Sequence, residues 1–337
     1  MANLLWIQTA CCGGESASLL NADQPGLAEA LRLVDAHVLW HPYLVAGDPP
    51  PLEELLARCA ADRTEVDVLV VEGAVCRPPH ACQTHRSMGT PAAEWIFEIA
   101  PRARYVVAAG TCASFGGVMI HRRNRPGMSG LQFQRDKRGG QLGEEFLSRN
   151  GLPVVNVPGC PAHPDWMIGT LYALLEGRMR PGDLDRFQRY RVFYSRLAHH
   201  GCPRNEYYEF KSSAEEWGQQ GCLFENLGCK GTQCESDCNE RLWLGRSGSC
   251  PRGGFPCLSC TSPLFPDGFS PFFETQKIGG IPTSLPLDVP KAWYVGISGL
   301  SKLACPERLR RNAVSATRVG PETGDEPDEH TDDDADV

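Results

Sequence analysis

Sixteen cysteines in 337 residues constrain this chain more than any other feature, because eight of them fall between Cys202 and Cys260. Residues 199–290 are rich in Cys, Gly and Pro and show little hydrophobic periodicity. A segment of this kind has too little regular structure to build an ordinary core, and it usually needs bound metal to hold it together. Cysteines at short spacings in a reducing compartment more often bind metal than form disulfides.

The distribution of charged and apolar residues indicates where the protein is located and what it does not bind. No Lys or Arg precedes Arg32, so we expect no export or transit signal and a cytoplasmic location. No window reaches the roughly 18 apolar residues that span a bilayer, so we expect no membrane span. The net charge of −8 comes from residues 313–337, where nine acidic residues face one arginine. The body is therefore neutral, which argues against nucleic-acid binding, and the acidic tail has the composition of a disordered segment.

The first 180 residues alternate short apolar runs with helical patterns. We expect strands at residues 4–8, 37–40, 66–72, 104–109 and 153–157, and helices at 25–34, 52–61, 91–100 and 165–176. Near-continuous apolar strands between helices favour an α/β fold with a flavodoxin-like parallel sheet. We therefore predict a flavodoxin-like domain over residues 1–180, an irregular cluster-binding domain over 181–312 and a disordered tail over 313–337.

Cysteines follow three of these predicted strands. Cys11 and Cys12 come after the first strand, Cys112 after the fourth and Cys160 after the fifth. Because the carboxyl ends of parallel strands share one edge of a sheet, where ligands bind, we expect these thiols to converge on a cluster or metal site.

The second domain supplies enough further ligands for two more sites. They are His199, Cys202, Cys222, Cys229, Cys238, Cys250, Cys257 and Cys260. Cys-x-x-Cys spacing fits both zinc and iron–sulfur clusters. Three sites in one chain resemble an electron relay more than three structural metals.

Several motifs, in order, carry a specific resemblance. They are GTCASFGG, VPGCPAHPDW, HHGCPRNEYYEF, GCLFENLGCKG and FPCLSCTSPLFPDG. From about Leu4 to Asn312 the chain resembles the small, electron-transfer subunit of nickel–iron hydrogenases. NEYYEFKSSAE, ENLGCKGTQ and VPKAWYV resemble the cytoplasmic uptake and hydrogen-sensing regulatory group most. The resemblance implies that hydrogen is split on a large-subunit partner. The active metal of this family needs two Cys-x-x-Cys pairs, whereas this chain has only Cys257 and Cys260, which the resemblance assigns to a cluster.

The resemblance also implies three iron–sulfur clusters and their ligands. The proximal cluster takes Cys12, Cys112 and Cys160; the distal cluster takes His199, Cys202, Cys222 and Cys229; the medial cluster takes Cys238, Cys257 and Cys260. Cys250 stands where many relatives have proline and a three-iron medial cluster, so a four-iron cluster is implied here. We interpret His200 as a neighbour of the ligand, and Cys59, Cys234 and Cys305 as ordinary thiols.

The first loop departs from the family pattern. Glu15 stands where the second proximal cysteine belongs. A carboxylate can bind iron, although it is a harder ligand than a thiolate. The alternatives for the fourth ligand are Cys11, Cys76, Cys82 and His85, and a three-iron proximal cluster is a further alternative.

The functional prediction is an iron–sulfur subunit that relays electrons from hydrogen oxidation in a large subunit. The motif likeness favours a hydrogen-sensing complex that informs a histidine kinase. The alternative is an uptake enzyme that passes electrons to a redox partner in metabolism.

Substitution of Cys250 by proline tests the medial assignment. Proline has no side-chain ligand atom, so Cys250→Pro is expected to convert the medial cluster alone to a three-iron form and to raise its potential. Electron paramagnetic resonance of the oxidised variant should reveal a new three-iron signal. A spectrum identical to that of the wild type would show that Cys250 is not a ligand.

Overall fold

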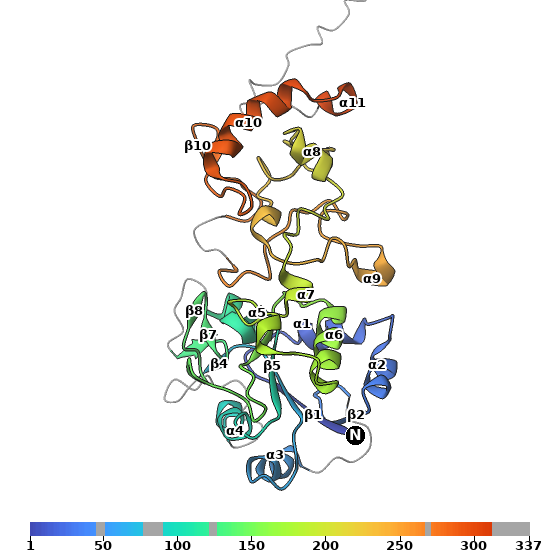
Figure 1. Cartoon of the computed structure of the whole chain (residues 1–337), viewed down its shortest axis with the longest axis vertical. Helices are drawn as coiled ribbons and strands as arrows, with labels where there is room; N and C mark the ends of the chain where they lie inside the picture. The colour runs from blue at the N-terminus through green and yellow to red at the C-terminus, as the bar shows by residue number, and fades with distance from the viewer. Residues whose placement is uncertain (45–50, 77–89, 121–126, 267–270, 312–337) are drawn as a thin grey trace, which may run out of the picture.

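The computed structural model describes residues 1–44, 51–76, 90–120, 127–266 and 271–311. An α/β domain occupies one end of an elongated molecule, and the cysteine-rich second domain extends from it along the long axis (Figure 1). Cys82, His85 and the acidic tail lie outside the described residues.

The α/β domain is built on five parallel strands. They are β1 (Ala2–Gln8), β2 (Ala36–Trp40), β3 (Val68–Glu72), β5 (Tyr105–Ala109) and β9 (Val155–Val157). Their order across the sheet is β2-β1-β3-β5-β9. This is the flavodoxin-like order, and it confirms the predicted fold class.

Alternate residues of the strands face two separate cores. Leu4 and Trp6 pack on the face covered by α1 (Gly14–Leu20), α2 (Leu27–Leu33) and α6 (Pro164–Leu175). Leu5 and Ile7 pack on the opposite face, against α3 (Leu52–Ala60) and α4 (Ala92–Ile99). Burial on both faces explains why the strands read as continuous apolar runs.

Shorter elements surround the sheet. They are α5 (Gly110–Phe115), a 3₁₀ turn at Gly117–Ile120, β4 (Val75–Cys76) paired with β6 (Met128–Ser129), and β7 (Phe133–Gln134) paired with β8 (Lys137–Arg138). Cys112 therefore lies in a short helix that directly follows β5 rather than in an open loop.

The second domain contains little regular structure before its C-terminal helix. Its elements are 3₁₀ turns at Pro181–Asp183 and Gly231–Gln233, α7 (Arg191–Tyr194), α8 (Asn205–Glu209), α9 (Trp243–Arg246), the hairpin β10 (Lys277–Ile278) and β11 (Ile281–Pro282), α10 (Lys291–Leu303) and α11 (Glu307–Arg310).

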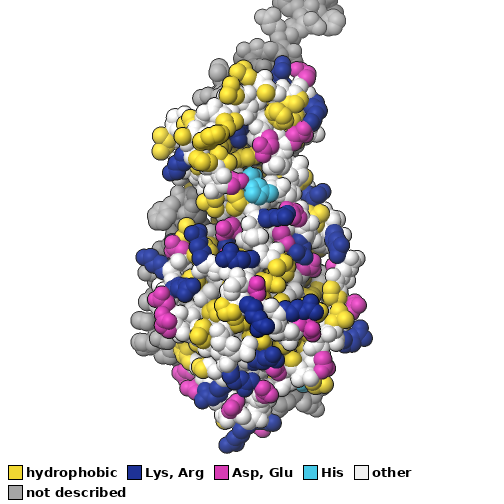
Figure 2. All heavy atoms as spheres, viewed as in Figure 1, with side chains coloured by type: hydrophobic (Ala, Val, Ile, Leu, Met, Phe, Trp, Pro, Cys, Tyr) yellow, Lys and Arg dark blue, Asp and Glu magenta, His cyan; other side chains and the backbone are white. Residues whose placement is uncertain are grey.

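Helix α10 lies at the far end of this domain and exposes much of its apolar side. Trp293, Leu300 and Leu303 are exposed, whereas Tyr294 is buried. Hydrophobic side chains gather over this end of the molecule in the space-filling view (Figure 2). None of the helices in the described ranges is both long and apolar enough to cross a bilayer.

Buried polar contacts join the two domains. The hydroxyl of Tyr194, in the second domain, donates to the carbonyl of Pro158 at 2.9 Å. Trp166 of α6 donates its Nε1 hydrogen to Asp237 at 2.6 Å. The carboxylate acceptor makes the second contact stronger than a neutral hydrogen bond, and the two contacts tie the cysteine-rich domain to the α/β domain.

The carboxylate of Glu72 joins strand β1 to the first turn of helix α1 at the carboxyl end of the sheet. Glu72 ends β3 and is fully buried, and its oxygens accept hydrogen bonds from Trp6 Nε1 at 3.0 Å and Gln8 Nε2 at 3.1 Å. They also accept from Ser16 Oγ at 2.5 Å and from the backbone N–H of Glu15 at 3.2 Å. A distant carboxylate thus caps the N-terminus of α1, where backbone N–H groups otherwise lack partners.

Removal of this carboxylate should destabilise the domain. Glu72→Ala leaves several buried donors unsatisfied, and each hydrogen bond to a charged group contributes roughly 1.5–3 kcal/mol, so we expect a loss of about 3 kcal/mol or more. Thermal unfolding of the purified protein measures the loss. Glu65→Ala, which removes a carboxylate that is 62% exposed, is the matched control and should change the stability by less than about 1 kcal/mol. Equal losses in the two variants would contradict the role given to Glu72.

Candidate cluster-binding sites

The predicted proximal ligands meet at one edge of the sheet. Cys12 lies between β1 and α1, Cys112 lies in α5, and Cys160 follows β9. Burial is the main cause of the raised pKa of Cys112, and the charge of nearby Cys160 is the next largest. The charges of Glu15 and Cys12 also raise the pKa values of both Cys112 and Cys160, so these side chains lie close together. The structure therefore brings together all four residues that the sequence placed in this site. Cys12 and Cys160 are exposed, whereas Cys112 is partly buried.

Glu15 is buried inside this set. Its Oε2 accepts a hydrogen bond from the backbone N–H of Ala162 at 2.6 Å. Its Oε1 lies so close to the backbone of Gly110 that a Cβ there would be 2.1 Å away, so only glycine fits. Burial, with help from the charge of Glu72, raises the pKa of Glu15 to about 8. An iron cation would favour the ionised form, so the site chemistry fits a carboxylate ligand.

Two alternatives for the fourth ligand lie nearby. Cys11 is partly buried, which raises its pKa to about 11, and it is close to Glu72, Cys12 and Glu15. Cys76 lies in β4 and packs against the same small apolar cluster as Cys112. The other two alternatives, Cys82 and His85, fall outside the described residues.

The predicted medial ligands gather around an additional thiol. The charge of Cys234 helps to raise the pKa values of all four predicted medial ligands, Cys238, Cys250, Cys257 and Cys260, so Cys234 lies close to each of them. The Cys234 sulfur lies 3.2 Å from Thr261 Oγ1 and 3.6 Å from Ser236 Oγ, and it shares a hydrogen bond with Cys257. These hydrogen bonds, that from Cys257 first, lower the pKa of Cys234.

Sequence reasoning missed the place of Cys234 in this set. The residue is only 1% exposed, and it lies four residues before Cys238. That short spacing was the available signal, but the family motif assigns no ligand at this position.

The predicted distal ligands line one small pocket. His199, Cys202, Cys222 and Cys229 all contribute to its wall, and His200 does not. The Nδ1 atom of His199 is buried and has no hydrogen-bond partner among the described residues. Its Nε2 atom instead lies 3.2 Å from Asp288 Oδ2. An unpartnered buried nitrogen beside three thiols is what an imidazole ligand to iron requires.

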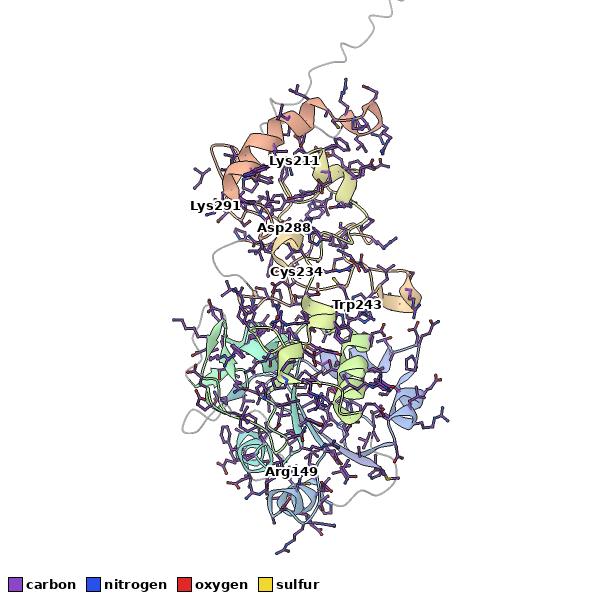
Figure 3. All side chains as sticks on the ribbon, in the orientation of Figure 1. Arg149, Lys211, Cys234, Trp243, Asp288 and Lys291 are labelled. Atoms are coloured by element: carbon purple, nitrogen blue, oxygen red, sulfur yellow. The ribbon has the colours of Figure 1, made fainter. Side chains whose placement is uncertain are left out.

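Two hydrogen bonds connect the three sets in series. The hydroxyl of Thr111, next to Cys112 of the proximal set, donates to the carbonyl of Cys260 in the medial set. The backbone N–H of Lys230, next to Cys229 of the distal set, donates to the carbonyl of Cys257 in the medial set at 2.7 Å. Figure 3 shows the labelled Cys234 and Asp288 at successive positions along the second domain, away from the α/β domain.

The thiols have the chemistry of metal ligands. Burial raises the pKa of Cys112 to about 12 and that of Cys229 to about 11, so these thiolates need a nearby cation. A tetrahedral zinc ion would hold its sulfur ligands about 3.8 Å apart, since Zn–S bonds are about 2.3 Å long. Among the described residues, the one His/Cys/Asp/Glu trio within 4.8 Å is His199, His200 and Asp288. No trio of thiols in the described ranges falls within this distance, which suits multi-iron clusters better than single zinc ions.

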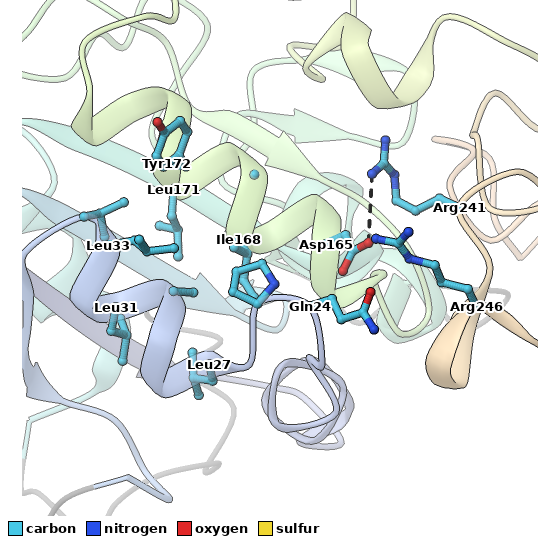
Figure 4. Close-up of a pocket in the computed structure, with 14 residues that line it drawn as sticks. Gln24, Leu27, Leu31, Leu33, Asp165, Ile168, Leu171, Tyr172, Arg241 and Arg246 are labelled. Carbon is cyan, nitrogen blue, oxygen red and sulfur yellow. Dashed lines mark ion pairs between the residues drawn. The ribbon is translucent and has the colours of Figure 1, made fainter.

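One cavity lies away from these thiols. It has a volume of about 470 Å³ between α2 and α6, and no cysteine lines it. Its wall is apolar at Leu27 and Ile168, and one end carries Asp165, which lies 3.9 Å from Arg241 (Figure 4).

Fold and thiol arrangement together define a cysteine-rich redox subunit on a flavodoxin-like domain, and comparisons with known proteins agree. The family model described as "NADH ubiquinone oxidoreductase, 20 Kd subunit" matches residues 12–174. A second family model, for the C-terminal part of the "NiFe/NiFeSe hydrogenase small subunit", matches residues 194–273.

Individual relatives identify the family. The chain is 32% identical to the small subunit of F420 non-reducing hydrogenase II from Methanosarcina mazei, over 82% of this chain and 77% of the relative. It is 32% identical to the periplasmic [NiFeSe] hydrogenase small subunit of Desulfomicrobium baculatum, over 82% and 88%. The solved actinobacterial-type NiFe-hydrogenase of Ralstonia eutropha H16 superposes with a TM-score of 0.73 at 31% identity, over 90% of this chain and 89% of that chain. The chain belongs to the small subunits of nickel–iron hydrogenases.

Membership in this family defines the general role. Small subunits of this family carry iron–sulfur clusters and pair with a large subunit. The chain is therefore the electron-transfer component of a hydrogenase heterodimer.

Substitution distinguishes Glu15 from the other candidates for the fourth proximal ligand. If the carboxylate binds iron, Glu15→Gln should change the proximal electron paramagnetic resonance signal, because a neutral amide is a poorer ligand. Cys82→Ser and Cys11→Ser should leave that signal unchanged. A changed signal in either cysteine variant, with Glu15→Gln unaffected, would move the assignment to that cysteine.

Proposed function

We propose that this subunit relays electrons, one at a time, through three clusters. The proximal cluster is held by Cys12, Cys112, Cys160 and Glu15, and the distal cluster by His199, Cys202, Cys222 and Cys229. The medial cluster is a four-iron cluster held by Cys238, Cys250, Cys257 and Cys260. The observation that carries the proposal is the serial connection of the three sets through the hydrogen bonds from Thr111 to Cys260 and from Lys230 to Cys257.

The polarity of the proposed relay follows from exposure and ligand type. Cys12 and Cys160 are exposed at the sheet edge, so a cluster there needs a second protein chain to cover it. Hydrogen is split in that large subunit, and the electrons enter at the proximal cluster. Imidazole carries less negative charge than a thiolate, so the histidine ligand raises the potential of the distal cluster and favours the arrival of electrons at the exit.

We further propose that the complex senses hydrogen in the cytoplasm and informs a histidine kinase. The segments NEYYEFKSSAE and VPKAWYV support the sensory role by their likeness to regulatory hydrogenases. The second candidate is an uptake hydrogenase that passes electrons to a redox partner in metabolism. It is favoured because the relatives named above are described as hydrogenases and none of them is described as a sensor.

Purification with its partners tests the relay. We expect a stable heterodimer that buries well over ~2,000 Å², contains three clusters by iron analysis and spectroscopy, and reduces dyes with hydrogen. A monodisperse, cluster-replete monomer from cells that lack the large subunit would contradict the proposal. Cys222→Ala, as an internal control, should remove the distal cluster alone.

The physiological role is tested separately. A sensor should co-purify with a histidine kinase, turn over hydrogen slowly and be required for hydrogen-dependent transcription. An uptake enzyme should instead support growth on hydrogen, and its deletion should leave transcription unchanged. Cell fractionation checks the proposed cytoplasmic location.

A further inference from the structure

A carboxylate connects two neighbouring histidines at the outer side of the proposed distal site. Asp288 Oδ2 lies 3.2 Å from His199 Nε2 and 2.8 Å from His200 Nε2. The imidazole rings are 4.4 Å apart between centroids. The Asp288 side chain is 32% exposed, so it is ionised at neutral pH and only accepts hydrogen bonds.

This contact determines which nitrogen of His199 is available to iron. A neutral imidazole carries one proton, and the hydrogen bond to Asp288 places that proton on Nε2. The lone pair then remains on Nδ1, which is buried and has no hydrogen-bond partner among the described residues. His199 shares the wall of the small pocket with Cys202 and Cys222. The Tyr208 ring, 4.9 Å from the His199 ring at 61°, packs against the imidazole and restricts its rotation.

The backbone around Asp288 is tied to the segment between the medial and distal sets. The backbone N–H of Leu287 donates to the carbonyl of Thr232 at 3.1 Å. Gln233 Nε2 donates to the carbonyl of Leu285 at 3.3 Å. These bonds hold the carboxylate in place relative to the thiols, so its contact with His199 is a fixed part of the site.

We propose that Asp288 is a positioning residue that fixes His199 as an Nδ1 ligand and lowers the potential of the distal cluster, an inference that rests on the distal site proposed above. A carboxylate that accepts the second N–H of a metal-bound histidine makes the imidazole more electron-donating. His200 donates a hydrogen bond to the same oxygen of Asp288, which weakens the hydrogen bond that this oxygen accepts from His199. The two residues therefore act on the exit potential in opposite directions.

Three variants of the intact heterodimer test this role. Asp288→Asn keeps the shape of the side chain but removes the charge, and His200→Ala removes the competing donor. Glu206→Gln removes a carboxylate of the same domain that pairs with Arg308 and is the control for a distant loss of charge. The readouts are the distal potential from a redox titration followed by electron paramagnetic resonance, and the remote-nitrogen coupling of the histidine ligand from pulsed spectroscopy.

Asp288→Asn is expected to shift the distal potential to a more positive value and to change the remote-nitrogen coupling. His200→Ala should shift the potential in the negative direction. Glu206→Gln should leave both readouts unchanged, and the medial and proximal signals should stay constant in all three variants. An Asp288→Asn potential equal to that of the wild type, or a shift of the same sign in His200→Ala, would overturn the assignment.

Two further variants cover loss of the cluster. If Asp288→Asn loses distal iron, retention of that iron in Asp288→Glu supports a role for the charge, and loss in both variants overturns it. Cys202→Ser separates this inference from the site on which it rests, because it should abolish the histidine-coupled signal. An unchanged signal in Cys202→Ser would overturn the distal site itself and the role of Asp288 with it.

Discussion

The buried carboxylate of Glu72 holds the first cluster-binding loop against the sheet, and the geometry of the sheet edge depends on it. It accepts hydrogen bonds from two side chains of β1 and from the first turn of α1. Cys12 lies between these two elements, so the same interaction fixes the approach of this thiol to Cys112 and Cys160. A loop held only by its own residues would lose this position easily, because Gly13 and Gly14 give its backbone great conformational freedom.

The second domain depends on the first for its order. Regular elements are few between Arg180 and α10, and side-chain contacts such as those from Trp166 to Asp237 and from Tyr194 to Pro158 hold this region on the α/β domain. The Thr111 hydroxyl donates to the carbonyl of Cys260, so the segment that carries Cys112 contacts the segment that carries a medial ligand. In the proposed relay, metal ligation would add to these contacts and contribute directly to the stability of the domain.

The sequence predicted the features that depend on local pattern. Strands buried on both faces appear as apolar runs, so their order along the chain and the flavodoxin-like class could be inferred. Helix α1 was missed because it has only seven residues, begins with glycine and contains two serines, and because its N-terminus is capped by Glu72, 56 residues away from Ser16. Asp288 was missed for the same physical reason, since it meets His199 across a sequence separation of 89 residues. The fourth proximal ligand stayed open because it depends on which side chains the tertiary structure brings to one edge.

The proposed relay changes its ligand chemistry toward the exit. Four thiolates at the medial cluster give way to three thiolates and one imidazole at the distal cluster, and each thiolate lost removes negative charge from the ligand shell. The carboxylate of Asp288 places a negative charge beside Nε2 of His199. This carboxylate is not itself an iron ligand in the proposed site, and it is partly exposed to solvent. A hydrogen bond can change without loss of a ligand, whereas a substituted thiolate removes a bond to iron. The potential at the exit can therefore be adjusted by residues around His199 while the cluster stays intact.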